Sequence, residues 1–160
     1  KGHYVMQKIL FICTGNTCRS PMAESIMQHM AKEHGLNIRV QSAGLAAAEG
    51  AAMAENAQEV LKEMQIDHEV TSKPVTHELI EWADWILTMT QSHKSHLLML
   101  KPDLEDKVFV LKQFVSDNPD EEVIDIVDPF GGSLEDYKHS AADIEAALRL
   151  LVYKLKEMQR

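Results

Sequence analysis

One short segment of the chain contains the residue types needed to hold and attack a phosphate. It reads Cys13-Thr14-Gly15-Asn16-Thr17-Cys18-Arg19-Ser20. An apolar run, 9–12, precedes it and Pro21 follows it, so the segment links a buried strand to the start of a helix. The backbone N–H groups of such a turn converge on one point, and the helix N-terminus adds partial positive charge. The segment therefore predicts an anion-binding loop.

Two side chains of this loop indicate what happens to the bound anion. Five residues separate Cys13 from Arg19, which places the thiol beneath the anion and lets the guanidinium make a two-pronged contact with its oxygens. The same positive field predicts that the thiol pKa falls from ~8.5 toward roughly 3.5–7.5. A thiolate held against phosphorus can attack it, giving a cysteinyl-phosphate that water later hydrolyses.

A purely structural cysteine is the alternative, because buried cysteines are common in protein cores. The neighbouring residues argue against it. Gly15 and Asn16 tolerate positive φ, and Ser20 followed by Pro21 is a good N-cap and first-turn pair. We therefore interpret Cys13 as the nucleophile and Arg19 as the phosphate clamp.

The leaving group of a phosphate ester or amide needs a proton, and Asp128 is the best candidate to supply it. It precedes Pro129, which restricts its backbone to extended conformations. It also lies in 116–133, the longest polar and turn-rich stretch of the chain, and long loops often carry functional residues. For the other acids of this stretch, a solvated surface role is the better interpretation.

Strand and helix patterns alternate along the chain. The expected strands are 8–12, 37–41, 84–89 and 108–111, and the expected helices are 21–34, 51–64, 77–83, 91–100 and 134–158. This alternation predicts an α/β fold: a single-domain three-layer sandwich with a four-stranded parallel sheet in the order 2-1-3-4 and helices on both faces. Ligands bind such sheets beyond the carboxyl ends of the strands, where the Cys13 segment leaves the first strand.

Charge and cysteine usage narrow the class of protein. The net charge is -9, from 25 acidic and 16 basic residues, which argues against nucleic acid or an anionic membrane as a partner. Both cysteines lie in the loop, so no disulfide framework is expected and a cytoplasmic setting is favoured. We expect no membrane span and no signal peptide, a monomer, and a domain over 6–160 preceded by an expression remnant at 1–5.

Three motifs together resemble the low-molecular-weight protein tyrosine phosphatases, and most closely their bacterial protein arginine phosphatase branch. They are the loop with Pro21, Met22, Ala23 and Glu24 after it, Ser42-Ala43-Gly44 after the second strand, and Asp128-Pro129-Phe130 late in the chain. The resemblance implies a cysteine-dependent phosphatase that acts on phosphorylated proteins without a metal or cofactor. It assigns Cys13, Arg19 and Asp128 the same roles as the reasoning from the residues.

The resemblance also implies roles for the other loop residues. The residues that bind the substrate phosphate would be Thr14, Gly15, Asn16, Thr17, Cys18 and Ser20. In the family, residues matching Asn16, Ser20 and Ser42 hold the loop in shape by hydrogen bonds, and the serine at Ser20 also helps the thiolate depart.

Thr17 is the residue that bears on specificity. Tyrosine-specific relatives generally have an aliphatic residue at this position, whereas arginine phosphatases resemble this chain in having threonine. A hydroxyl on the loop rim suits the polar guanidinium of phosphoarginine, and sites that hydrogen-bond a substrate discriminate better than apolar walls. We therefore expect hydrolysis of phosphoarginine in proteins. A phosphotyrosine phosphatase is the alternative, with Thr17 as a tolerated variant.

Cys18 and His93 are less informative. Cys18 is either a small filler or a thiol that captures an oxidised Cys13 and protects it from irreversible oxidation. His93 and His96 are interpreted as surface histidines, because no third zinc ligand is suggested nearby.

Two other classes of protein share parts of this pattern. A thiol-dependent arsenate reductase needs further cysteines outside the loop, and the chain has none. A phosphopeptide-binding module without turnover needs neither the nucleophile nor the acid, so the presence of both argues against it.

Overall fold

The computed structural model describes residues 6–118, 120–122 and 124–159. The segment 1–5, expected to be an expression remnant, lies outside the described residues. Four parallel strands form one sheet: β1 (Gln7–Cys13), β2 (Ile38–Gly44), β3 (Trp85–Thr88) and β4 (Val108–Val110). Their order is β2-β1-β3-β4. The predicted sheet order is therefore confirmed.

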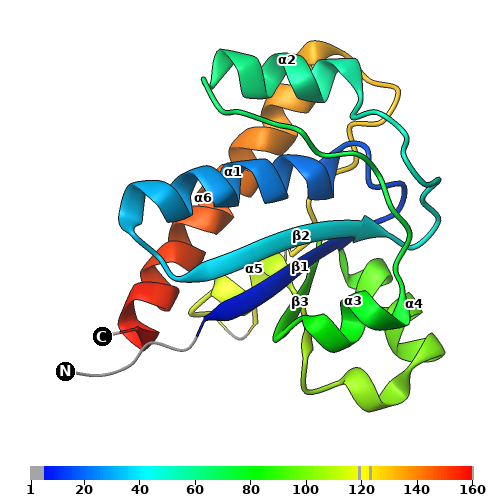
Figure 1. Cartoon of the computed structure of the whole chain (residues 1–160), viewed down its shortest axis with the longest axis vertical. Helices are drawn as coiled ribbons and strands as arrows, with labels where there is room; N and C mark the ends of the chain where they lie inside the picture. The colour runs from blue at the N-terminus through cyan, green and yellow to red at the C-terminus, as the bar shows by residue number, and fades with distance from the viewer. Residues whose placement is uncertain (1–5, 119, 123, 160) are drawn as a thin grey trace.

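Helices cover both faces of this sheet (Figure 1). On one face lie α1 (Arg19–His34), α5 (Leu111–Val115) and the long α6 (Leu134–Met158), with α2 (Glu55–Glu63) packed against α6. On the other face lie α3 (His77–Trp82), α4 (Gln91–Leu100) and the short 3₁₀ helix η1 (Pro102–Leu104). The three-layer α/β sandwich is confirmed.

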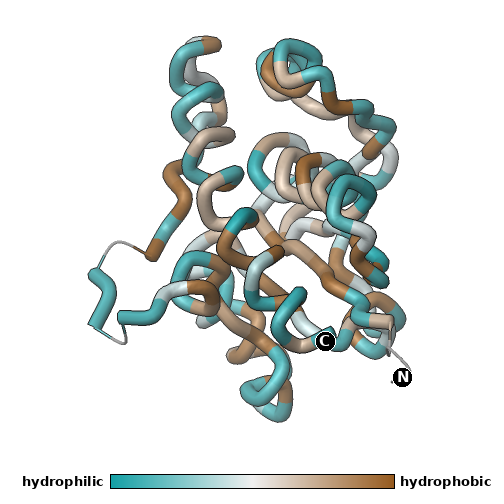
Figure 2. The backbone as a smooth tube through the Cα atoms, turned by 90° about the vertical axis from the view of Figure 1, so that its left-hand side faces the viewer, coloured by the Kyte–Doolittle hydropathy of each residue, from teal (hydrophilic) through white to brown (hydrophobic). Residues whose placement is uncertain are grey.

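Strand β1 is the centre of the core because it is covered on both sides. Ile9 and Phe11 pack in the cluster beneath α1 and α6, whereas Leu10 and Ile12 pack in the cluster beneath α3 and α4. All four side chains are fully buried. A continuous apolar run is what a parallel strand buried on two faces requires, and the apolar stretches run through the middle of the molecule in Figure 2.

Three local predictions were wrong. Ser20 does not cap α1, because the helix begins at Arg19 and the Ser20 hydroxyl bonds to the Cys13 sulfur instead. Helix α2 begins at Glu55 rather than at position 51, since the backbone N–H of Ala54 donates to the Thr17 carbonyl at 2.9 Å and the segment before it is extended. The predicted strand 108–111 ends at Val110, and the chain turns at once into α5.

Helix α6 forms over the residues that the pattern predicted. Ser133 and Asp136 make a capping box at its start, with the Ser133 hydroxyl accepting from the Asp136 N–H and the Asp136 carboxylate accepting from the Ser133 N–H. Its apolar stripe, from Ile144 to Leu155, is buried against α1. In the part of the chain that the structure describes, no helix has the length and apolar character needed to cross a membrane.

Candidate active site

The Cys13 segment leaves β1 at the carboxyl edge of the sheet and turns directly into α1. Cys13 is the last residue of β1 and pairs in register with Gly44, the last residue of β2. The loop approaches β2 so closely that a Cβ on Gly44 would lie 2.5 Å from the Thr14 carbonyl oxygen and 2.9 Å from the Asn16 nitrogen. Real Cβ atoms essentially never come this close to backbone. Gly44 therefore lets the loop fit, and the Ser42-Ala43-Gly44 motif forms the end of β2 rather than following the strand as predicted.

The thiol of Cys13 is buried among hydrogen-bonding groups. Its Sγ lies 2.8 Å from the Ser20 hydroxyl and accepts from the Asn16 N–H at 3.3 Å. Burial raises the pKa of this thiol, while hydrogen bonds from Ser20 and Asn16 and the charge of Arg19 lower it by less. The predicted lowering of the thiol pKa was therefore wrong in its net direction. The lowering groups are present, but desolvation outweighs them.

Asn16 holds the loop in its turn. Its side-chain nitrogen donates to the hydroxyls of Ser20 at 2.8 Å and Ser42 at 2.9 Å, and its side-chain oxygen accepts from the Lys73 N–H at 3.0 Å. Asn16 has a φ of 55°, whereas Gly15 does not have positive φ. The contacts expected for Asn16, Ser20 and Ser42 are all formed.

A buried carboxylate completes this hydrogen-bonded chain. Ser42 donates to Glu24 at 2.5 Å, and Glu24 lies on α1 with 9% of its surface exposed. Burial raises the pKa of Glu24, opposed by the hydrogen bond from Ser42 and the charge of Lys73. Glu24 thus connects through Ser42, Asn16 and Ser20 to the thiol.

The late loop carries Asp128 to the same place. Ile126 is fully buried, and its N–H donates to the carbonyl of Met89 just beyond β3. The Arg19 guanidinium donates to the Ile126 carbonyl at 2.9 Å, and its other nitrogen lies 3.6 Å from an Asp128 carboxylate oxygen. Arg19 is 6% exposed and Asp128 52% exposed. Residues more than a hundred positions apart in sequence therefore share one site.

These residues surround a cavity of about 220 Å³. Its walls are Cys13, Thr14, Gly15, Thr17, Cys18, Arg19, Asp128 and Phe130. Asn16 and Ser20, predicted to bind substrate, are buried and do not line it. Their side chains shape the loop, because both are used in the hydrogen bonds beneath it.

The comparisons with known proteins agree with this geometry. A family model described as low molecular weight phosphotyrosine protein phosphatase matches residues 8–160. The chain belongs to this family. Members are cysteine-dependent phosphatases.

Individual relatives point to two substrates within the family. A protein-arginine-phosphatase of Bacillus subtilis is 42% identical over 95% of this chain and 99% of its own length. The low molecular weight protein-tyrosine-phosphatase PtpB of Staphylococcus aureus is 36% identical over 94% of this chain and 98% of its own length. A solved structure of the YwlE arginine phosphatase, in a cysteine-to-serine mutant with a phosphorylated active-site serine, superposes with a TM-score of 0.88, at 41% identity over 94% of this chain and 96% of that one.

His93 is a part of this phosphatase site that the sequence analysis missed. It is 6% exposed, and its Nε2 lies 2.9 Å from the hydroxyl of Thr14 on the cavity wall. Burial and the charge of Arg19 lower the pKa of His93 to about 4, so it is neutral at neutral pH. The prediction of a surface histidine was wrong for His93, whereas His96 is exposed. The available signal was its place in the first turn after β3, at the same edge of the sheet.

Cys18 contacts α6 from the floor of the cavity. Its sulfur lies 3.3 Å from the Tyr137 hydroxyl and 3.7 Å from the Thr17 hydroxyl. Burial, followed by the interaction with Cys18, raises the pKa of Tyr137. Both cysteines are free thiols. Capture of an oxidised Cys13 by Cys18 stays a prediction.

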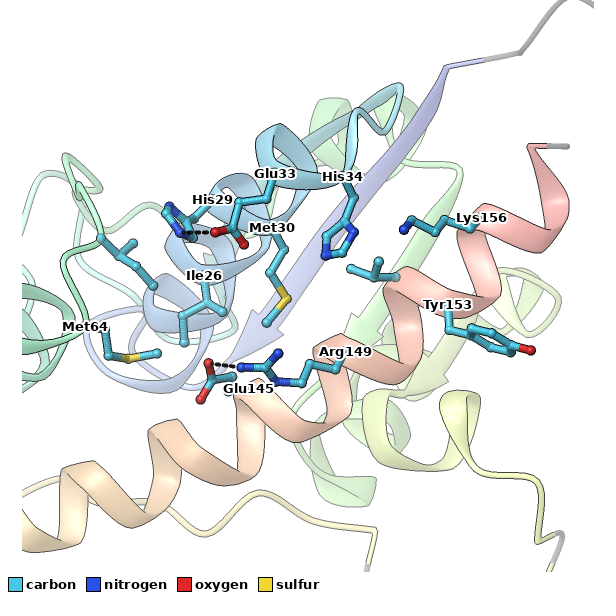
Figure 3. Close-up of a pocket in the computed structure, with 12 residues that line it drawn as sticks. Ile26, His29, Met30, Glu33, His34, Met64, Glu145, Arg149, Tyr153 and Lys156 are labelled. Atoms are coloured by element: carbon cyan, nitrogen blue, oxygen red, sulfur yellow. Dashed lines mark hydrogen bonds and ion pairs between the residues drawn. The ribbon is translucent and has the colours of Figure 1, made fainter.

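A separate groove lies between α1 and α6, with side chains such as Met30, His34, Arg149 and Lys156 around it (Figure 3). It shares no lining residue with the cavity at Cys13. The chemistry of the family therefore belongs to the smaller cavity.

Proposed function

We propose that this phosphatase hydrolyses phosphoarginine in proteins through a cysteinyl-phosphate intermediate. The observation that carries this proposal is the shared cavity of Cys13, Arg19 and Asp128, which supplies a nucleophile, a cation and an acid within one hollow. The similarity to protein-arginine-phosphatases over nearly the whole chain supports the choice of substrate.

In the first step, the Cys13 sulfur attacks phosphorus as a thiolate and the P–N bond of phosphoarginine breaks. Because burial raises the thiol pKa, the thiolate depends on the Ser20 hydroxyl, the Asn16 N–H and the Arg19 charge beside it. Arg19 and the loop N–H groups stabilise charge on the equatorial phosphate oxygens. The protonated Asp128 carboxyl gives its proton to the departing guanidine nitrogen.

In the second step, water attacks the phosphorus of the cysteinyl-phosphate and the S–P bond breaks. The Asp128 carboxylate, now ionised, accepts the proton from this water, and inorganic phosphate leaves. The Ser20 hydroxyl, 2.8 Å from the sulfur, stabilises the departing thiolate. Asp128 is thereby returned to its protonated form for the next cycle.

Thr17 supports phosphoarginine as the substrate. It lines the cavity, and its carbonyl is held by the Ala54 N–H, so its side chain stands on a fixed part of the rim. A hydroxyl at this position can hydrogen-bond to the guanidinium of phosphoarginine. The aromatic ring of phosphotyrosine makes no use of such a partner.

Phosphotyrosine is the second candidate substrate. The tyrosine phosphatase PtpB, 36% identical to this chain, favours it, and so does the exposed aromatic ring of Phe130 on the cavity wall. The two substrates differ in how they depend on Thr17, so they can be separated by experiment.

The setting of the reaction is also a proposal. We infer that the partners are phosphorylated proteins and not nucleic acid, since the net charge of -9 repels polyanions. The two free thiols support a cytoplasmic location. We also propose that the protein acts as a monomer.

The catalytic assignment is tested with Asp128→Asn. General acid catalysis is worth ~10²–10⁴-fold, so kcat should fall by that range while the affinity for inorganic phosphate is not weakened. Asp125→Asn is the matched control: Asp125 lies in the same loop, and its carboxylate accepts from the Gln91 N–H, a bond that asparagine can keep. Normal turnover by Asp128→Asn, or an equal loss in the control, would refute the assignment.

A covalent intermediate is tested by rapid quenching during turnover of a phosphoarginine peptide. One phosphoryl group should be found on the peptide that contains Cys13. A quenched enzyme without it, at a time when product is accumulating, would exclude the covalent route.

A further inference from the structure

A second hollow lies on the other side of the Asp128 loop. Its volume is about 630 Å³, and it is formed by the segment 127–132 together with the first turns of α6. Asp128 and Phe130 line both this hollow and the cavity at Cys13. The two spaces are therefore neighbours that share these two side chains. We call residues 127–130, which line this hollow beside the cavity at Cys13, the ridge. A polypeptide whose phosphorylated side chain enters the cavity at Cys13 passes over the ridge to reach the second hollow.

The ridge presents apolar side chains to solvent. Val127 and Phe130 are each 75% exposed. Their backbone is nevertheless held in place, because the Ser140 hydroxyl donates to the Val127 carbonyl at 2.7 Å and the Phe130 N–H donates to Asp128 at 3.0 Å. Exposed apolar side chains on a fixed backbone next to an active site are suited to contact a substrate.

The charge of the hollow comes from acids. Asp128, Asp136 and Asp143 line it together with His139, and its described lining contains neither lysine nor arginine. Asp128 is paired with Arg19 and Asp143 with Lys112. Asp136 accepts the N–H of Ser133 but has no cationic partner among the described residues. Of the three carboxylates, that of Asp136 is therefore the one without an ion pair among the described residues.

We propose that this second hollow binds a lysine or arginine side chain of the substrate polypeptide, a few residues from the phosphoarginine. This inference rests on the proposed function. Long basic side chains have an aliphatic stem and a charged end. The stem would pack on Val127 and Phe130, with the cation within reach of the Phe130 ring and facing Asp136. A short polar residue could not reach both the apolar side chains and Asp136, and an acidic residue would be repelled by Asp136.

The experiment compares phosphoarginine peptides that carry lysine, glutamine or glutamate at flanking positions, on the N-terminal and C-terminal sides in turn. For the unsubstituted protein, kcat/KM should be about three- to tenfold higher with lysine than with glutamate on one side, mainly through KM, since charges at a rim contribute modestly. The preference should weaken as salt is added.

Asp136→Asn should bring the lysine-to-glutamate ratio close to one. Asparagine can still accept the Ser133 N–H, so the start of α6 is kept. Glu135→Gln is the matched control, because Glu135 is an exposed acid in the same turn that does not line the hollow, and it should retain the full preference. An equal loss in both variants would mean a general field of the acidic protein, which overturns the proposal.

Free phosphoarginine separates this inference from the proposed function. It has no flanking residues, so it reports only on the cavity at Cys13. If the unsubstituted protein hydrolyses it but shows no preference among the peptides, the second hollow is not a subsite. If it hydrolyses neither free phosphoarginine nor the peptides, the proposed function itself fails.

Discussion

At the scale of single residues, the site depends on a hydrogen-bonded chain that ends at the nucleophile. Ser20 is its last member, 2.8 Å from the Cys13 sulfur. Ser20 is the second residue of α1, and its hydroxyl bonds to Cys13 and Asn16 of the loop. Burial of Cys13 raises the pKa of its thiol, and the hydrogen bond from Ser20 opposes this by stabilising the thiolate. This role explains the position of Ser20.

Removal of this hydroxyl should make Cys13 less reactive. In Ser20→Ala the thiol pKa rises further, because a group that lowers it is lost. Alkylation of Cys13 by iodoacetamide at pH 7 should slow by about ten- to a hundredfold, the range that corresponds to the loss of a hydrogen bond to a charged group. Ser25→Ala is the control, since Ser25 is equally buried on α1 and its hydroxyl has no partner among the described residues. Alkylation of Ser20→Ala at the parent rate would contradict this role.

At the scale of elements, the ends of β1 and β2 fix the loop. Cys13 and Gly44 are paired at the carboxyl edge, and the loop backbone lies directly against Gly44. The segment before α2 adds a bond from Ala54 to Thr17. The active loop is thus held on both sides by elements that carry no chemistry themselves.

Gly44→Ala should displace the loop. The new Cβ would lie 2.5 Å from the Thr14 carbonyl and 2.9 Å from the Ala47 methyl. We expect a loss of roughly 1–3 kcal/mol in the free energy of unfolding, as for overpacking, and a lower kcat/KM. Ala47→Gly in the same chain removes only the contact with a side chain, so it should not restore activity. Full rescue by Ala47→Gly would show that the loop backbone is not the obstacle.

The element pattern was predictable where periodicity was strong. Strand β1 was predictable from its continuous apolar run, which arises because both faces of the strand are covered. Helix α6 was predictable because its apolar stripe continues along the helix. The start of α2 and the short α5 were not predictable. Helix α2 starts late because the N–H of Ala54 is bonded to the Thr17 carbonyl of the loop. Helix α5 has only five residues, too few to show a helical periodicity in the sequence.

At the scale of the whole molecule, the parallel sheet brings distant residues to one edge. The order β2-β1-β3-β4 and the partnership of Cys13, Arg19 and Asp128 were predictable from alternation and motif. His93 was not, because its burial depends on how α4 packs beside the loop. The net direction of the Cys13 pKa was also missed, since local charges were visible in the sequence but the depth of burial was not.

Burial of neutral His93 should make the fold sensitive to acid. Its pKa is about 4 in the folded protein against 6.5 when unperturbed, so the unfolded chain binds a proton first and stability falls as the pH drops from 6.5 to 4. Between pH 7.5 and 5 this loss is roughly 2 kcal/mol. Urea unfolding of His93→Gln should show a loss smaller by that amount, whereas the exposed neighbour His96→Gln should behave like the parent. Parallel losses in all three proteins would exclude His93 as the cause.

The central claim is that the cavity at Cys13 is built for phosphoarginine. The most direct test is the ratio of kcat/KM for two peptides of the same sequence, one with phosphoarginine and one with phosphotyrosine. We expect a ratio well above one, and a fall in this ratio for Thr17→Ile, which replaces the rim hydroxyl with an apolar chain. A ratio below one, or a ratio that Thr17→Ile leaves unchanged, would contradict it.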